Sequence, residues 1–504
     1  MLDAINTNII SLQTQNNLTN SQNSLSESIN RLSSGLKINS AMDDPAGLAI
    51  ASRMKSQVNG LNQATQNANN GVSMLQTADG GLASTTALLQ SMRSLAVEAA
   101  NGTNSSTDLA SLQTEITQLQ AQVGQVSSQT QYNGINLLDG SATNTQFQVG
   151  ANAGQVINVA IQSASETALG SNQLSSLATP TVATAASAQT TGLTAISNGQ
   201  AVQNITIQGT SPTASTFNEL AGVSAQKVAA DINTATTNGA NPTGVSATAS
   251  TVATLTFGAT GVQSITLGGA YNASGTFIQP QAISASYTAG GSYQSMADAI
   301  NKYSGTTGVT ATLVANNGGI TLSNTTGADI QVTNQNAAGT MTLTGGSGGT
   351  QTLAINSGTN GATVAGTVAL SSASGFAASS SAAGFFAVAS AGSTLNTVAT
   401  IDVTKTLNGI PTGANQALAI IDGAISQVNT NRAQIGAYEN RFTATVANLQ
   451  TSTLNITAAL STVQDTNFAS ETASLSRGQI LQQAGTAMLA QANSLPNGVL
   501  ALLR

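Results

Sequence analysis

The sequence predicts a multidomain α+β protein. Long helices from both termini are expected to form a coiled-coil-like core, and the middle of the chain is expected to form β-rich outer domains. Three observations support this prediction. The chain has 504 residues, more than one hydrophobic core usually organises. Apolar residues follow helical spacing near both ends, and short alternating runs lie between them.

The N-terminal helical pattern is clearest over residues 61–99. Apolar residues recur there every seven positions, at Leu61, Ala68, Leu75, Leu82, Leu89 and Ala96. A second series with the same spacing holds mostly small side chains, at Ala64, Gly71, Ala78, Thr85, Met92 and Ala99. Spacings of three, four or seven return from Leu418 to Val463. Such sustained a and d positions predict long packed helices, one of them from about Pro45 to Ala100. An ordinary helical bundle is the alternative interpretation.

The stretch "GLKINSAMDDPAG" separates two of the predicted helices. Gly35 follows an apolar-periodic run, as a glycine at a helix C-terminus does. Asp44 is expected to cap the next helix, and Pro45 to occupy its first turn, where the missing N–H costs nothing. The functional alternative is that Asp43 and Asp44 are paired carboxylates for acid/base chemistry, but caps of this kind are common and favour the structural interpretation.

The middle of the chain, residues 176–399, changes character. Runs such as "QNITIQG" and "GITLSN" alternate apolar and polar residues between Gly, Asn and Ser, which predicts strands and turns. The segments 200–260 and 261–335 resemble one another loosely. Three motif pairs carry this resemblance: "VQNITIQG" with "VQSITLGG", "VAADIN" with "MADAIN", and "TGVSAT" with "TGVTAT". Two copies of a small unit, each with strands around one short helix, are therefore expected.

Composition excludes several classes of function. The chain has no Cys, His or Trp, and only 6% of its residues are charged. Zinc proteases, Ser-His-Asp hydrolases and Cys-His proteases all require residues that are missing. With 12 Lys and Arg and a net charge of −7, no basic patch for nucleic acid is expected. We therefore expect no catalytic residues, no metal site and no cofactor.

The N-terminal residues show no sign of a cleaved secretory signal. No Lys or Arg precedes Arg31, and no apolar core follows a basic start. No run of apolar residues approaches the length that spans a bilayer, so membrane insertion is not expected. A cytoplasmic protein, or one exported by a route that leaves its N-terminus uncut, remains as the expectation.

Both ends of the chain closely resemble bacterial flagellin. The N-terminal resemblance rests on "INTNIISLQTQNNL", "SINRLSSGLKINSAMDDPAGLAIASRM" and "SSQTQYNGINLLDG". The C-terminal resemblance rests on "ALAIIDGAISQVNTNRAQIGAYENRF" and "SRGQILQQAGTAMLAQANSLPNGVLALLR". It implies three layers: a channel-lining helical domain from 1–44 and 460–504, a helical second layer from 45–175 and 400–459, and variable β-rich outer domains from 176–399.

The resemblance also implies function and partners. Such a chain is exported unfolded through the flagellar type III apparatus and folds as it assembles with copies of itself into the extracellular filament used for swimming. An export chaperone and the cap and hook-associated proteins are the further partners implied. The hook–filament junction protein of the same family is the alternative. An adhesin would be expected to carry a signal and an anchor, and a metalloprotease insert would need the missing His.

Two sets of site residues follow from the resemblance. The family's contact segment for the flagellin-sensing Toll-like receptor corresponds to Leu89, Gln90, Arg93, Leu95 and Glu115, whereas Ser91 departs from the Arg usual in flagellins that are sensed well. The expected assembly seams lie at the two ends of the chain, on Leu2, Ile5, Ile9, Leu481, Ala484, Met488 and Leu495.

Overall fold

The computed structural model describes most of the chain. The described residues are 7–176, 183–185, 198–209, 213–238, 243–268, 280–288, 292–314, 318–336, 339–346, 349–354, 360–382, 385–386, 390–406 and 412–502; for 183–185, 236–238 and 495–502 only the backbone is described. The chain folds into two compact units. The terminal unit comprises Met1–Leu75, Asn144–Val159 and Gly436–Arg504, and the central unit comprises Gln76–Thr143 and Ala160–Ile435.

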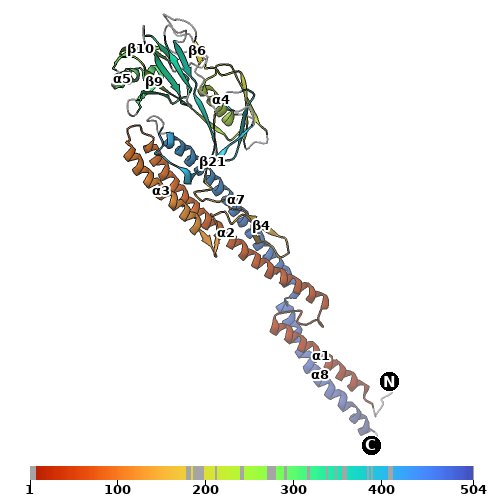
Figure 1. The fold of residues 1–504 in the computed structure, drawn as a ribbon. Coiled ribbons are helices and arrows are strands. Elements are labelled where there is room, and N and C mark those ends of the chain that lie inside the picture. The colour runs from red at the N-terminus through yellow and green to blue at the C-terminus, as the bar shows by residue number, and fades with distance from the viewer. Residues whose placement is uncertain are drawn as a thin grey trace. The chain divides into compact units, whose positions relative to one another are not determined.

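The secondary structure confirms the predicted fold class of long terminal helices around a β-rich middle (Figure 1). The helices are α1 (Ile9–Ser34), α2 (Pro45–Ala99), α3 (Ser106–Gln129), α4 (Ala225–Asn238), α5 (Gln294–Lys302), α6 (Ser304–Thr307), the short 3-10 helix η3 (Val398–Thr400), α7 (Thr412–Gln464) and α8 (Phe468–Leu502). The boundaries of the two compact units differ from those of the three expected layers, so the three-layer division stays a prediction.

In the terminal unit, α1 and α8 lie side by side and antiparallel, with both chain ends at the same end of the pair (Figure 1). The part of α2 up to Leu75 and the part of α7 from Gly436 pack together around Leu61, Ala64 and Leu449. Gly71 leaves room for the ring of Phe442, because a Cβ there would lie 2.8 Å from that ring. The hairpin of β3 (Thr145–Gln148) and β4 (Val156–Val159) adds Phe147, whose ring meets Phe442 edge-on at 5.4 Å.

All twelve heptad positions on α2 are buried. Those from Ala78 onward lie in the central unit, where α3 begins with a capping box in which Ser105 and Asp108 bond each other's backbone N–H groups. Two ion pairs link α2 to α7 in this unit: Arg432 with Asp79 at 2.8 Å, and Arg93 with Asp422 at 2.7 Å.

The strands of the middle pair antiparallel throughout the described ladders. An eight-stranded sheet follows the path β12-β13-β9-β18-β5-β21, with β15 paired to β9 and β16 paired to β15, and a five-stranded sheet follows β11-β10-β14-β17-β6. A four-stranded sheet follows β20-β19-β7-β8, and β1 pairs with β2. The bounds are β1 (Gln131–Tyr132), β2 (Ile135–Asn136), β5 (Gly170–Ser175), β6 (Ala183–Ala185), β7 (Gln203–Gln208), β8 (Ser215–Glu219), β9 (Ser246–Phe257), β10 (Gly261–Gly268), β11 (Gln281–Tyr287), β12 (Thr310–Leu313), β13 (Ile320–Asn324), β14 (Ile330–Asn334), β15 (Met341–Gly345), β16 (Thr350–Leu353), β17 (Gly361–Val364), β18 (Thr367–Ser372), β19 (Ala377–Ser380), β20 (Ala391–Gly392) and β21 (Thr394–Thr397).

Two lobes that share a strand–strand–helix–strand order occupy the two similar segments. Lobe one is β7, β8, α4 and β9, and lobe two is β10, β11, α5, α6, β12 and β13, with the short helix α6 and the strand β13 as additions. In both lobes an Asn at the helix holds the following strand at the backbone of one Ala. Asn233 bonds the N–H and C=O of Ala247, each at 2.8 Å, and Asn301 bonds those of Ala311 at 2.7 and 2.8 Å. Each lobe has its own apolar core.

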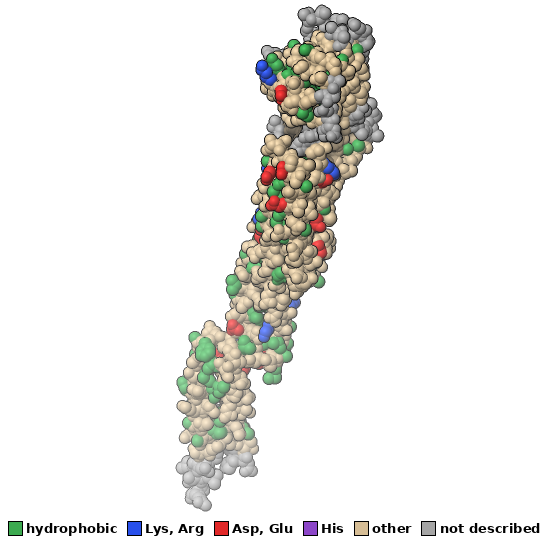
Figure 2. All heavy atoms as spheres, turned by 60° about the vertical axis from the view of Figure 1, so that its left-hand side comes forward, with side chains coloured by type: hydrophobic (Ala, Val, Ile, Leu, Met, Phe, Trp, Pro, Cys, Tyr) green, Lys and Arg blue, Asp and Glu red, His purple; other side chains and the backbone are tan. Residues whose placement is uncertain are grey.

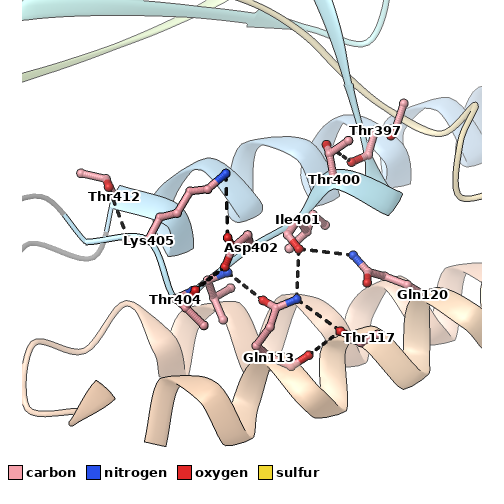
Figure 3. A network of polar contacts seen from close by, with 11 residues as sticks. Gln113, Thr117, Gln120, Thr397, Thr400, Ile401, Asp402, Thr404, Lys405 and Thr412 are labelled. Carbon is pink, nitrogen blue, oxygen red and sulfur yellow. Dashed lines mark hydrogen bonds and ion pairs between the residues drawn. The ribbon is translucent and has the colours of Figure 1, made fainter. Parts of the chain in front are cut away.

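The chain leaves the helical part for the lobes and returns to it through neighbouring strands. β5 and β21 pair with Gly170 opposite Thr397. The returning segment then lies on α3, where Gln113 bonds the C=O of Ile401 at 3.1 Å and the N–H of Val403 at 2.8 Å (Figure 3). Two turns further along α3, Gln120 donates to the C=O of Val398 at 2.6 Å. The lobes are thus an insertion whose two ends are held together.

Candidate self-assembly surface

The contact between α1 and α8 is built from small residues. Gly478, Gly485 and Ala492 are seven apart on α8 and face α1. A Cβ at Gly478 would lie 3.2 Å from Leu25, and one at Gly485 would lie 3.1 Å from Leu18. At the open end of the pair, the side chain of Asn8 donates to the C=O of Ala492 at 2.8 Å. The absence of side chains at these glycines lets the two helices approach closely.

On α1, the less exposed positions also follow the heptad spacing, and half of them are hydroxyl residues: Ser11, Thr14, Leu18, Ser21, Leu25, Ser28, Arg31 and Leu32. Only Ser28 among the residues of α1 is fully buried. The side of α1 that meets α8 therefore mixes hydroxyl groups with leucines, of which Leu18 and Leu25 pack against the glycines of α8. Much of the apolar surface of α1 nevertheless stays outside this contact, unlike that of an ordinary amphipathic helix, which turns its apolar stripe inward.

Many large apolar side chains of both helices remain uncovered. We call the following exposed residues the apolar face: Ile9, Ile10, Leu12 and Ile29 on α1, and Phe468, Ile480, Leu481 and Met488 on α8. Ile9, Leu481 and Met488, three of the predicted seam residues, are 65%, 52% and 60% exposed, and Ala484 is exposed as well. Figure 2 shows hydrophobic side chains on the surface of this helix pair. Leu2 and Ile5 lie outside the described residues, as does the side chain of Leu495.

Charge is sparse on the two helices. α1 carries only Glu27 and Arg31, which form an ion pair one turn apart, and α8 carries only Glu471 and Arg477. An exposed apolar surface with few charges is unfavourable for a chain that stays alone in water. It allows many identical copies to pack without strong like-charge repulsion.

The connector after α1 fixes how the helix pair begins. Gly35 ends α1 with φ at 73°, and its N–H donates to Arg31. Asp44 accepts from the N–H of Gly47 at 2.9 Å, and α2 begins at Pro45. The connector also bonds the α7–α8 link, because the N–H of Lys37 donates to Gln464 at 2.7 Å.

The two neighbouring aspartates are both engaged in this local structure. Asp43 accepts hydrogen bonds from the N–H groups of Asn39 and Ser40 at 3.0 and 2.8 Å. The backbone hydrogen bonds of Ser40 and Asn39 lower the pKa of Asp43. A general acid near neutral pH needs a raised pKa, so Asp43 is unsuited to that role.

The predicted receptor-contact residues divide into two groups. Gln90, Ser91 and Arg93 on α2 and Glu115 on α3 are exposed, although Arg93 is already paired with Asp422. Leu95 is half-buried, and Leu89 is fully buried in the heptad seam. Leu89 therefore has a packing role in the folded chain, and its side chain is not available on the surface.

Sequence reasoning missed the small-residue seam on α8. The available signal was the seven-residue spacing of Gly478, Gly485 and Ala492, which the apolar pattern conceals. It also missed Gln113 and Gln120, because nothing in the sequence pairs an α3 glutamine with a backbone carbonyl far along the chain. Among the described helices, none is long and apolar enough to cross a membrane. The described residues also contain no group of three or more potential metal ligands.

Comparison with known families gives matches at both ends and in the middle. Residues 5–143 match the model of the bacterial flagellin N-terminal helical region, and residues 418–503 match that of the bacterial flagellin C-terminal helical region. Residues 269–326, most of lobe two, match the flagellin hook IN motif.

Whole-chain relatives agree with these matches. B-type flagellin of Pseudomonas aeruginosa is 40% identical over 512 residues, covering 99% of each chain. Flagellin of Salmonella typhimurium is 35% identical over 515 residues, covering 100% of each chain. Among solved structures, FliC from Burkholderia pseudomallei is 24% identical, covering 74% of this chain and 99% of its own, with a TM-score of 0.30.

Proposed function

This chain belongs to the bacterial flagellin family and is a self-assembling structural subunit of the flagellar filament, and we propose that the apolar face of α1 and α8 is the surface through which its copies bind one another. The observation that carries this proposal is the orientation of the two helices. They meet through small and hydroxyl residues together with Leu18 and Leu25, and they leave Ile9, Leu481 and Met488 exposed to water. Neighbouring copies would cover these side chains, and each buried one would contribute about 2 kcal/mol.

The roles of the three layers are part of the same proposal. Residues 1–44 and 460–504 would line the filament channel, 45–175 and 400–459 would form the second layer, and 176–399 would project outward. The paired ends of the insertion at β5 and β21 support this division, because they let the lobes vary without disturbing the helices. The hook–filament junction protein is not adopted as the function, since the whole-chain relatives carry the name flagellin.

Export, placement and partners are inferred from the family. The chain would be secreted unfolded through the flagellar type III apparatus and would act outside the cell. Its export chaperone, and the cap and hook-associated proteins, would bind the same terminal helices before or during assembly. No catalytic role is proposed, and the chain has neither His nor Cys to support the common ones. The exposed Gln90, Arg93 and Glu115 would contact the flagellin-sensing Toll-like receptor.

Polar substitution on the apolar face tests the proposal. In the double variant Leu481→Asn and Met488→Asn, purified chains seeded with filament fragments should fail to elongate, or should need a much higher protein concentration. Electron microscopy and sedimentation measure the outcome. Neither side chain contacts a buried core in the single chain, so the central unit should keep its unfolding transition.

The matched control is Val262→Asn, which changes an equally exposed apolar residue on β10 in lobe two. This variant should elongate like the wild type. Normal elongation by the double variant, or equal failure of both variants, would contradict the assignment of assembly to the terminal helices.

A further inference from the structure

Lobe one differs from lobe two in how its helix is seated. α4 packs Val228 and Ile232, both fully buried, into the lobe core beside Ile205. α5 does the same in lobe two through Met296 and Ile300. The two helices differ in the carboxyl groups around them, because two buried carboxyls, one at the end of β8 and one in the loop after β13, lie beside α4, whereas lobe two contains only the exposed Asp298.

The first carboxyl belongs to Asp329, in the loop that leads from β13 to β14. Its side chain is 1% exposed, and its Oδ2 accepts from the side-chain amide of Asn198 at 2.7 Å. The same amide donates to the C=O of Val223, just before α4, at 2.8 Å. The first turn of α4 also bonds this loop, since the N–H of Gln226 donates to the C=O of Gly327 at 3.1 Å. Asp329 thus lies in the junction that holds the start of α4.

One oxygen of Asp329 is left without a partner. Its Oδ1 is buried and makes no hydrogen bond among the described residues. Burial raises the pKa of Asp329 to about 7, against the hydrogen bonds of Asn198 and the Gly366 N–H, which lower it. A carboxyl with one unpaired buried oxygen favours the protonated form, because the neutral group is cheaper to bury than the charged one.

The second carboxyl belongs to Glu219, at the end of β8. It is 3% exposed, and its Oε1 has no hydrogen-bond partner among the described residues. Asp231 and Lys227 face it from α4, where they form an ion pair with each other. Burial first, and then the charge of Asp231, raise the pKa of Glu219 to about 7, while Lys227 acts in the opposite direction. The strands β7, β9 and β18, which complete the lobe, contain no titratable side chain.

We propose that Asp329 and Glu219 together form a pH-responsive clamp on α4, which holds the helix in lobe one while the two buried carboxyls are protonated and loosens it when they ionise. The clamp is a property of the outer lobes and does not depend on filament assembly. It would let this part of the chain stiffen in acidic surroundings and relax at neutral and alkaline pH.

The direction in which pH changes the stability of α4 follows from proton binding. Both carboxyls have a folded pKa near 7, above the ordinary value near 4 that they regain when α4 opens. Below pH 4 both states hold the protons and the stabilisation is fully present. As pH rises from about 4 to about 7, opening releases protons, so the opening equilibrium rises by about tenfold per pH unit for each carboxyl. Above pH 7 the effect levels off.

Hydrogen exchange on the depolymerised full-length chain tests the clamp. Protection factors, which correct for the intrinsic pH dependence of exchange, are compared between α4 and α5 peptides at pH 5, 6, 7 and 8. The protection of α4 should fall by about tenfold or more per pH unit from pH 5 to 7. The protection of α5, which has no buried carboxyl, should change little. This comparison within one molecule needs no variant.

Two substitutions assign the effect to its residues. Asp329→Asn keeps a neutral group of the same shape, so it should lower the slope of α4 protection by about tenfold per pH unit and leave the helix better protected at pH 7 than in the wild type, with the remaining slope due to Glu219. Asp298→Asn on α5 is the matched control and should behave like the wild type. Equal pH dependence of α4 and α5, or an unchanged slope in Asp329→Asn, would overturn the proposal.

Discussion

The terminal helices and the β-rich lobes differ in how far they bury their apolar side chains. In the lobes, apolar side chains such as Leu255, Ile265 and Ile205 are fully buried within the chain. On α1 and α8 many of them are exposed, although the two helices touch along much of their length. The lobes can therefore be stable in a single chain, whereas a single chain leaves much of the apolar surface of the helix pair in water.

Deletions should have the largest effect, because they test directly whether the terminal helices or the lobes are needed for assembly. Removing Gly478–Arg504 takes away most of α8, including both glycines of the seam and Leu481 and Met488 of the apolar face, so no filaments should form. Removing Thr190 to Ser390 takes away the lobes but keeps β5 and β21, and filaments should still form with a thinner and smoother outline. Electron microscopy of seeded samples at identical salt measures both.

Each deletion serves as the control for the other. Both purified chains should first show helical circular dichroism. Filaments from the C-terminal deletion, or none from a folded middle deletion, would show that the lobes and not the helices direct assembly.

Hydrogen exchange on the monomer compares the protection of the terminal helices with that of the lobes. Residues before about 35 and after about 465 should show no protection, because few of them are buried in the single chain and ordering each residue costs about 1 kcal/mol or more. The strands of the lobes should be protected in the same sample. Strong protection of α1 or α8 in depolymerised protein would mean that their small-residue seam suffices to fold them.

A cavity in the core of lobe two should affect stability and leave assembly intact. Leu255→Ala removes a fully buried side chain near the end of β9 that packs into the core of lobe two, which should cost about 2–5 kcal/mol. Calorimetry should show a lower unfolding temperature for the lobes, and the variant should still polymerise. Val262→Ala, on the exposed side of β10, should stay within about 0.5 kcal/mol of the wild type. Loss of filaments in a folded Leu255→Ala chain would contradict the separation of the two regions.

A matched pair of substitutions tests whether the two lobes unfold independently. Asn301→Ala leaves the N–H and C=O of Ala311 without their partner, and Asn233→Ala does the same to Ala247. Each should cost about 1–3 kcal/mol. Exchange rates should rise in α5 for the first variant and in α4 for the second. If either substitution affected both lobes equally, the lobes would be one cooperative unit.

The smallest structural effect is expected on the surface of α2. Ser91→Arg adds a cation to an exposed position, so stability should change by less than about 0.5 kcal/mol. Receptor signalling in a reporter-cell assay should rise, because the added Arg restores the family's usual residue beside Gln90 and Arg93. The same substitution at exposed Ser94 is the control and should leave signalling unchanged. An equal response to both variants would count against the assignment of the contact segment.

The long helices could be predicted because their signal is local and repeated. Every heptad position from Leu61 to Ala99 is buried, and α2 begins at Pro45 as its cap predicts. The Gly35 turn was equally readable, since few residues other than Gly adopt a positive φ there. The similarity of the lobes is visible in short motifs. The motif "MADAIN" contains Asn301, which holds the following strand in lobe two.

The amino-acid sequence by itself determined the helical spacing, the caps, the strand-forming middle and the membership of the family, because each depends on neighbours close along the chain. The tertiary structure decided which face of α1 and α8 is covered. Periodicity marks apolar positions but does not say what will cover them, and here Leu25 and Leu18 pack against Gly478 and Gly485 while Ile9, Leu481 and Met488 stay exposed. The buried state of Asp329 and Glu219 was likewise decided by packing, since a carboxyl acquires its environment from segments distant in sequence.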